Sequence, residues 1–233
     1  MTDNASSRQP VVLSWSGGKD SALTLRALLS DDRYDVVALM TTVSGEDGRI
    51  SSHGVRESLL DQQVADMDLP PLHKVYLPTD HSGFCTNSQY ERAIYEAIFK
   101  HIEAGVTTVA FGDLFLEDLR CYRERMMHRM GMKAIFPLWM RDTTELACQF
   151  IEEGFKACLS CVDGRKLDSS FAGRPYDTDL LRDLPVNVDP CGEYGEFHSF
   201  VFDGPIFRKP VDVAVARSHA CEPFHFVELQ LCN

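Results

Sequence analysis

The sequence feature that most constrains the fold is a glycine-rich turn near the N-terminus, set between an apolar run and a helical pattern. Residues 11–15 read Val-Val-Leu-Ser-Trp, residues 16–21 read Ser-Gly-Gly-Lys-Asp-Ser, and leucines then recur at helical spacing. Glycines let a backbone approach an anion closely, and a helix N-terminus carries about half a positive charge. The pattern therefore predicts a strand, a phosphate-binding loop and a helix.

This loop differs from a Walker A motif, which needs a glycine five residues before the Gly18-Lys19 pair, where this chain has Leu13. A simple helix cap by Ser16 or Asp20 is the plainer alternative. Capping alone does not explain six specific residues in a strand, loop and helix context. We therefore predict that the loop binds phosphate.

The rest of residues 1–140 alternates short β-branched runs with longer helical patterns, which is typical of a parallel sheet wound by helices. The predicted strands are 11–15, 36–42, 73–77, 108–112 and 133–136. The predicted helices are 21–29, 55–67, 87–101 and 117–130. These elements predict an α/β fold: a doubly wound, Rossmann-like sheet of five parallel strands.

Residues 141–233 show a different pattern and predict a smaller α+β module. A helix is expected at 143–153 and an apolar, cysteine-bearing run follows at 155–162. A stretch rich in Gly, Pro and Asp covers 163–195. Strands are then expected at 197–202, 211–216 and 224–231, forming a terminal antiparallel sheet.

The composition limits the kinds of binding partner and the cellular location that we expect for this chain. The formal net charge of −12 repels a phosphate backbone, and the basic residues of 120–129 are interleaved with acids, so nucleic acid is not expected as a partner. No run of about 18 apolar residues and no leader-like N-terminus is present, so we expect no membrane segment and a cytoplasmic location. We expect the eight cysteines to be reduced. A homo-oligomer is compatible with the sequence.

The order Ser-Gly-Gly-x-Asp-Ser resembles the PP-loop of the N-type ATP pyrophosphatases, within the adenine nucleotide alpha hydrolase-like proteins. The resemblance implies that ATP is split between its α and β phosphates, with Lys19 neutralising the leaving pyrophosphate and Asp20 near Mg²⁺. The small residues of the loop would hold the β and γ phosphates: Ser16, Gly17, Gly18 and Ser21.

Two later segments resemble the diphthine–ammonia ligase family within that group. One runs from Gly112-Asp113 to the Pro-Leu-Trp turn at 137–139, and the other is the Gly-Glu-Tyr-Gly-Glu stretch at 192–196. The resemblance implies that ATP adenylates a carboxylate of a small molecule or a protein, after which ammonia attacks the acyl adenylate. Glu193 and Glu196 would then bind ammonium and take its proton, or would orient a cation of the substrate.

Further site residues follow from the same resemblance. Met40 and Thr41 would lie beside the adenine, and His53 would contact the nucleotide from the second loop. Gly112 and Asp113 follow a predicted strand, and ligands of open α/β sheets bind outside the carboxyl ends of the strands. A helix cap is the alternative for His53, and a solvated acidic turn is the alternative for the two glutamates.

Two other function classes remain open on the sequence alone. A tRNA-thiolating PP-loop enzyme would use the Cys-x-x-Cys of Cys158 and Cys161, although a zinc or iron–sulfur site would need more ligands from distant positions. A non-catalytic adenine nucleotide sensor would bind ATP and leave it unchanged. The intact Lys19 and Asp20 favour an enzyme over a sensor.

Overall fold

The computed structural model describes residues 8–44, 48–51, 53–67, 69–78 and 85–232, and its first sheet lies in the N-terminal part of the chain. Within these residues, β1 (Gln9–Ser14), β2 (Tyr34–Ser44), β4 (Leu72–Leu77), β5 (Thr108–Ala110) and β6 (Lys133–Ile135) pair in parallel, in the order β4-β2-β1-β5-β6. The short β3 (Arg49–Ile50) adds an antiparallel pair at the end of β2. The order reverses between β1 and β5, which makes their carboxyl ends the expected ligand site.

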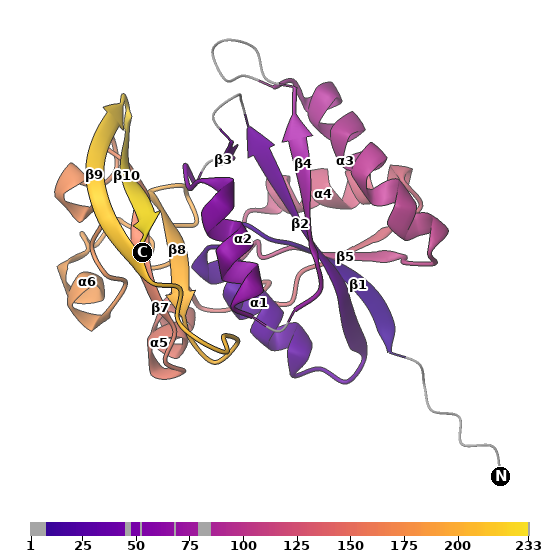
Figure 1. The fold of residues 1–233 in the computed structure, drawn as a ribbon, viewed down its shortest axis with the longest axis horizontal. Helices are drawn as coiled ribbons and strands as arrows, with labels where there is room; N and C mark the ends of the chain where they lie inside the picture. The colour runs from indigo at the N-terminus through magenta and orange to yellow at the C-terminus, as the bar shows by residue number, and fades with distance from the viewer. Residues whose placement is uncertain (1–7, 45–47, 52, 68, 79–84, 233) are drawn as a thin grey trace.

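Helices cover both faces of this sheet (Figure 1). Helices α1 (Lys19–Leu29) and α2 (Glu57–Ala65) lie on one face, and α3 (Asn87–Glu103) and α4 (Glu117–Arg129) lie on the other. The alternation of β1 explains this arrangement, because Val11 and Leu13 join the core under α1 and α2 whereas Val12 joins the core under α3 and α4. The doubly wound, Rossmann-like prediction is confirmed.

The C-terminal part forms a second sheet of four antiparallel strands. Its order is β8 (Phe197–Asp203), β7 (Lys156–Asp163), β10 (Phe224–Leu231) and β9 (Val213–Cys221). The cysteine-bearing run becomes β7, which lies between β8 and β10 rather than outside the terminal strands. Strand β9 begins two residues later than the predicted strand 211–216 and continues to Cys221, because it pairs along nearly its whole length with β10.

The stretch 163–195 has more structure than its composition predicts. It contains a 3-10 helix, η1 (Ser169–Phe171), and α6 (Thr178–Asp183), which lies near α5 (Thr143–Glu152). Asp168 and Asp177 cap these two helices by accepting hydrogen bonds from the Ser170 and Leu180 amides. Several of its aspartates are thus helix caps.

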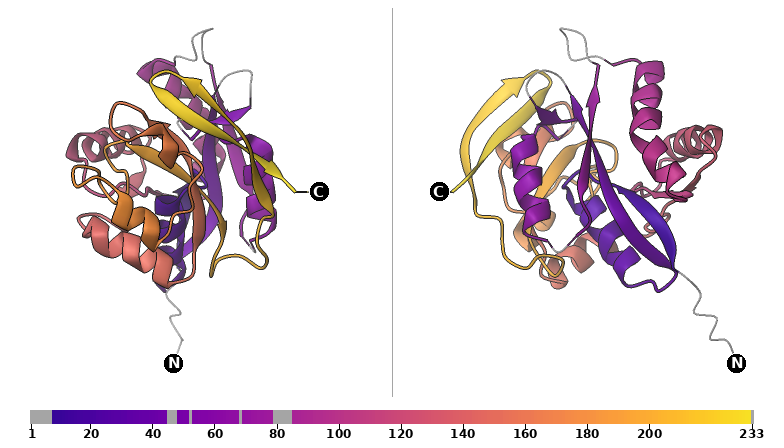
Figure 2. Two further views of the ribbon diagram at one scale, coloured as in Figure 1. Left: turned by 90° about the vertical axis from the view of Figure 1, so that its left-hand side faces the viewer. Right: turned by 45° about the vertical axis from the view of Figure 1, so that its right-hand side comes forward.

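The second sheet packs over α1 and α2 without a break in the core (Figure 2). One buried apolar cluster includes Trp15 after β1, Leu60 on α2, Phe150 on α5 and Phe200 on β8. A division of the chain after residue 140 remains a prediction, since both parts share this core. Their packing places the loop before β8 directly against the loop after β1.

Candidate functional site

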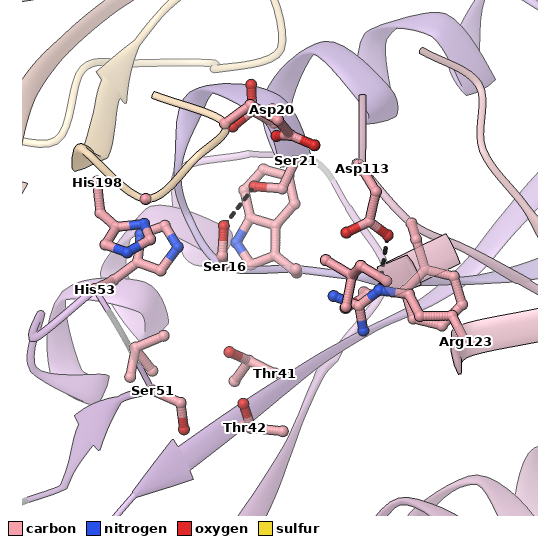
Figure 3. A pocket seen from close by; sticks show the side chains of 18 of the residues that line it. Ser16, Asp20, Ser21, Thr41, Thr42, Ser51, His53, Asp113, Arg123 and His198 are labelled. Carbon is pink, nitrogen blue, oxygen red and sulfur yellow. Dashed lines mark hydrogen bonds and ion pairs between the residues drawn. The ribbon is translucent and has the colours of Figure 1, made fainter. Parts of the chain in front are cut away.

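A cavity of about 420 Å³ opens at the carboxyl ends of β1, β2 and β5, and the loop before β8 closes one side of it. Figure 3 shows polar side chains that face this cavity from several elements. Most of the predicted site residues line the cavity: Ser16, Asp20, Ser21, Met40, Thr41, His53, Gly112, Asp113 and Glu193. The switch point of the sheet has therefore brought together residues that are up to 177 positions apart.

The phosphate loop, residues 16–21, presents its hydroxyl groups to the cavity. Ser16 Oγ and Ser21 Oγ are 3.3 Å apart, and Ser21 Oγ donates to the Gly18 carbonyl at 2.8 Å (Figure 3). The Gly18 amide points toward Ser16 Oγ, at 3.3 Å. Since α1 starts at Lys19, the loop forms the N-terminus of a helix at the wall of the cavity, which favours an anion there.

Neighbouring segments explain the loop glycines. Gly17 has a φ of +77°, which side chains disfavour. A Cβ on Gly18 would lie 2.9 Å from His53 Cε1 and 3.0 Å from the Ser199 carbonyl oxygen. A Cβ on Gly112 would lie 3.2 Å from the Asp20 carbonyl oxygen, so this glycine lets the end of β5 approach α1. Gly17 and Gly18 do not line the cavity and act through their backbone.

Lys19 is buried and does not line the cavity. Its side chain is 2% exposed, and Nζ donates to both Asp20 carboxylate oxygens and to the Cys191 carbonyl. Burial lowers the pKa of Lys19, but the nearby Asp20 carboxylate, together with Cys191 and Glu193, raises it overall, so the ammonium stays charged. Lys19, which was predicted to neutralise the leaving pyrophosphate, therefore connects α1 to residues 191–196. We call these residues the glutamate loop.

The two predicted glutamates of the glutamate loop have different surroundings. Glu193 lines the cavity, and its Oε1 accepts from the Leu114 amide at 2.8 Å. Burial raises the pKa of Glu193 to about 7, and the neighbouring Asp20 and Asp113 carboxylates act in the same direction. Glu196 lies outside the cavity lining, is 3% exposed, and accepts from the Asp189 amide at 3.2 Å. Only Glu193 is thus placed to meet a ligand in this cavity.

Apolar groups and unpaired hydroxyls form another part of the cavity wall. Met40, Phe111 and Met126 line it together with Thr41 and Ser51. Thr41 Oγ1 and Ser51 Oγ are buried and have no hydrogen-bond partner among the described residues. Buried hydroxyls normally find partners, so a flat, polar-edged group such as adenine would fit this wall.

Two histidines lie against each other at the cavity (Figure 3). The ring centroids of His53 and His198 are 4.6 Å apart, and His53 Nδ1 donates to the Ser199 carbonyl at 3.2 Å. Burial lowers the pKa of His53 to about 4, and burial together with His53 lowers the pKa of His198 well below its usual range. Both rings are therefore neutral near pH 7.

Asp113 is engaged in an ion pair at the far side of the cavity. Arg123 Nε donates to its Oδ2 at 2.7 Å, and the guanidinium lies over the Phe111 ring at 4.6 Å (Figure 3). Arg120, from the same helix, lies over the Trp139 ring at 4.7 Å and pairs with Glu124. Two arginines of the predicted basic stretch thus pack against aromatic rings, where they are tied to neighbouring acids.

Cys158 and Cys161 lie on β7, outside the lining of the cavity. Burial raises the pKa of each thiol to about 12, so thiolate is scarce near neutral pH. In the part of the chain that the structure describes, no three His, Cys, Asp or Glu side chains form a metal-binding group.

The described residues also contain no helix that is long and apolar enough to cross a membrane.

Several cavity residues were missed by the sequence analysis. His198 and Ser199 follow the Gly-Glu-Tyr-Gly-Glu motif after one residue, Phe197, and their position on a strand next to that motif was the available signal. Trp15, the last residue before the phosphate loop, lines the cavity through its buried ring. Arg123 had no such signal, because its approach to Asp113 depends on how α4 packs.

Comparisons with known proteins show similarity to the diphthine–ammonia ligases. Residues 142–230 match a family model described as the diphthamide synthase C-terminal domain. The chain is 26% identical over 215 residues to a diphthine–ammonia ligase from Schizosaccharomyces pombe, covering 84% of this chain and 34% of that protein. It is 25% identical to one from Rattus norvegicus (90% and 85% of the two chains) and 26% identical to one from Danio rerio (84% and 83%).

This chain thus spans about a third of the fission yeast protein and most of the rat and zebrafish proteins. The resemblance predicted from the phosphate loop, the Pro-Leu-Trp turn and the glutamate loop is confirmed. The matches cover both the parallel sheet and the second sheet, which meet at the cavity.

Proposed function

We propose, from the relationship of this chain to the diphthine–ammonia ligases, that it is an ATP-dependent ligase that joins ammonia to a carboxylate. The reaction would run in two steps. The carboxylate attacks the α phosphate of ATP, giving an acyl adenylate and pyrophosphate. Ammonia then attacks the acyl carbon, forming the C–N bond of the amide and breaking the C–O bond to AMP.

The observation that carries this proposal is the position of Glu193. Its carboxylate lines the cavity from the loop before β8, which packs against the phosphate loop, and is held by the Leu114 amide. A carboxyl group with a pKa of about 7 can exchange a proton near neutral pH. Glu193 would accept a proton from bound ammonium, and the resulting neutral ammonia is the nucleophile that the second step needs.

The cavity suits ATP in size and in the groups it offers. Its volume of about 420 Å³ falls within the range of roughly 300–1,000 Å³ for small-molecule sites. The hydroxyls of Ser16 and Ser21 and the N-terminus of α1 would face the phosphates, while Met40 and Thr41 would meet the base. An acyl adenylate needs little further activation, so positioning supplies most of the expected catalysis.

A magnesium ion would accompany the nucleotide. Mg²⁺ usually binds one or two carboxylates together with substrate phosphates and waters, so it needs no cage of protein ligands. Asp20 fits that role, since it lines the cavity as part of the phosphate loop and its side chain is 32% exposed. The ion would neutralise charge on the leaving pyrophosphate.

The acceptor would be a carboxylate that resembles diphthine, the substrate in the names of the relatives. The neutral His53 and His198 rings would contact it by hydrogen bonds rather than by charge. The nitrogen donor would be free ammonia, held as ammonium near Glu193. A second active site that releases ammonia would then not be needed.

Product analysis tests the proposal. The purified protein is incubated with α-labelled ATP, Mg²⁺ and ammonium, with and without a diphthine-bearing acceptor. AMP and pyrophosphate should appear in equal amounts and only when the acceptor is present. Release of ADP and phosphate, or ATP that stays intact with acceptor and ammonium present, would contradict the ligase assignment.

The Glu193→Gln variant separates the two steps. Since Gln keeps an acceptor for the Leu114 amide but cannot take a proton, it should still exchange labelled pyrophosphate into ATP with the acceptor alone. It should fail to form amide when ammonium is added. Loss of the exchange reaction in this variant would place Glu193 in adenylation instead.

A further inference from the structure

A buried glutamine, Gln63 on α2, connects three segments beneath the phosphate loop. Its side chain is 0% exposed. Its Nε2 donates to the Gly17 carbonyl at 3.0 Å and to the Val201 carbonyl at 2.6 Å, while its Oε1 accepts from Trp15 Nε1 at 2.9 Å. Both amide hydrogens are used. The reversed amide would face the indole donor with a donor, so these bonds fix its orientation.

The carbonyl of Gly17 is the shared centre of this arrangement. It accepts from Gln63 Nε2 and also from the Val201 amide on β8, at 2.9 Å. The peptide between Gly17 and Gly18 is planar, and in a trans peptide the C=O and the following N–H point in opposite directions. Holding the Gly17 carbonyl toward β8 therefore turns the Gly18 amide toward Ser16 Oγ, and Ser16 belongs to the cavity lining.

The close packing around Gly17 leaves this peptide little freedom to turn. A Cβ on Gly17 would lie 3.0 Å from Gln63 Oε1 and 3.0 Å from Leu60 Cδ1. The φ of +77° at Gly17 is the conformation that this orientation requires. Without Gln63, the Gly17 carbonyl would keep only the Val201 amide as a donor among the described bonds, and a rotated peptide would present an oxygen to the cavity instead of an N–H.

We propose that Gln63 is a positioning residue for phosphate binding: it fixes the Gly17–Gly18 peptide so that the Gly18 amide faces the phosphates of the nucleotide. This role rests on the proposed binding of ATP in the cavity. It predicts a selective loss of phosphate binding. The Gly18 amide would contact the phosphates, whereas the adenine would lie against a different part of the cavity wall. Gln63 does not line the cavity and acts through the loop.

Two variants and one control test this role. Gln63→Glu keeps the shape but replaces the amide N–H groups with an oxygen, and Gln63→Met removes both hydrogen-bonding groups. The control is Gln62→Ala on the same helix, because the Gln62 side chain donates only to the Asp66 carboxylate in the described bonds. Affinities for ATP and for adenosine are measured by calorimetry on protein whose thermal unfolding shows it to be folded.

We expect both Gln63 variants to bind ATP at least about tenfold more weakly, which corresponds to roughly 1.4 kcal/mol, and to bind adenosine within about twofold of the unchanged protein. As the pH falls, Gln63→Glu should regain ATP affinity relative to the unchanged protein, because a protonated carboxyl can donate to one carbonyl. Gln63→Met should not. If Gln63→Met fails to fold, the near-isosteric Gln63→Glu carries the test.

The outcomes are distinguishable. Equal losses for ATP and adenosine would mean that Gln63 only supports the fold, and unchanged ATP affinity in folded variants would also overturn the role. If the unchanged protein binds no ATP, the proposed function itself fails. Weaker ATP binding by Gln62→Ala of similar size would assign the effect to α2 as a whole.

Discussion

The phosphate loop and the glutamate loop both combine glycines with two charged residues, of which one lines the cavity and the other is buried, but the buried charge differs in sign between them. In the phosphate loop the cation Lys19 is buried, and Asp20 lines the cavity together with Ser16 and Ser21. In the glutamate loop Glu193 faces the cavity, and Glu196, three residues later, is buried against the Asp189 amide.

The two loops also support one another. The Lys19 ammonium holds the Cys191 carbonyl of the glutamate loop, and the Lys19 amide donates to Ser199 Oγ on β8 at 3.1 Å. A charged residue in a motif can thus serve either the ligand or the second loop. Spacing in the sequence does not decide which, because the direction of each side chain depends on a segment that is distant in the chain.

The largest expected difference is between the two glutamates in activity. Glu193→Gln should lower kcat for amide formation by about 100-fold, as for loss of a general base, while Glu196→Gln should change it less than about threefold. In the unchanged protein the activity should rise as the pH passes through about 7, where Glu193 loses its proton, and the variant should lack this step. A pH series of initial rates measures both.

Equal losses in the two variants would remove this contrast between the glutamates. Thermal unfolding of both variants controls for folding, since Glu196 is the more buried of the two. A rate that rises through pH 7 in Glu193→Gln would assign that proton to another group.

The second contrast concerns Lys19 and Ser21 of the phosphate loop. Lys19→Met should lower the free energy of unfolding by about 3 kcal/mol, because it leaves the Cys191 carbonyl and the Asp20 carboxylate without their shared buried cation. Ser21→Ala should cost about 1 kcal/mol, since it removes one hydrogen bond to the Gly18 carbonyl. Urea denaturation of both variants measures the difference. Unchanged stability in Lys19→Met would mean that the side chain is free to face the cavity.

Much of the fold could be predicted because its signals are local. The unbroken apolar run of Val11, Val12 and Leu13 identifies a strand buried on both faces, and the leucines after residue 21 identify the helix that follows. The loop between them is therefore predictable in position and in general chemistry. The terminal strand of residues 224–231 was predictable for the same reason.

The site was less predictable because its contacts are long-range. Gln63 looks like a polar residue in an amphipathic helix, and only the approach of Val201, 138 positions away, buries it. Arg123 looks like part of an exposed basic stretch until α4 places it beside Asp113. The inward turn of Lys19 likewise depends on Cys191, 172 positions later.

The smallest expected effect concerns His53, which connects the segment between β3 and α2 to β8 through the Ser199 carbonyl. Its pKa of about 4 lies below the ordinary value of 6.5. Between these two pH values the unfolded chain therefore binds a proton at His53 that the folded chain does not bind. The stability that this neutral ring contributes is present above pH 6.5 and is lost as the pH falls toward 4. Between pH 7 and 5 we expect a loss of about 1–2 kcal/mol from this group.

His53→Asn can keep a donor to the Ser199 carbonyl while removing the titration. The unfolding free energy of this variant should therefore fall less between pH 7 and pH 5 than that of the unchanged protein, as measured by urea denaturation at each pH. His198→Asn provides the matched comparison, because its ring is buried in the same pair but belongs to the strand that follows the glutamate loop. The curves of unfolding free energy against pH for His53→Asn and the unchanged protein would contradict this prediction if they were parallel. His53 would then become protonated without leaving its place. The loss of stability at acid pH would belong to His198 or to groups outside the two loops.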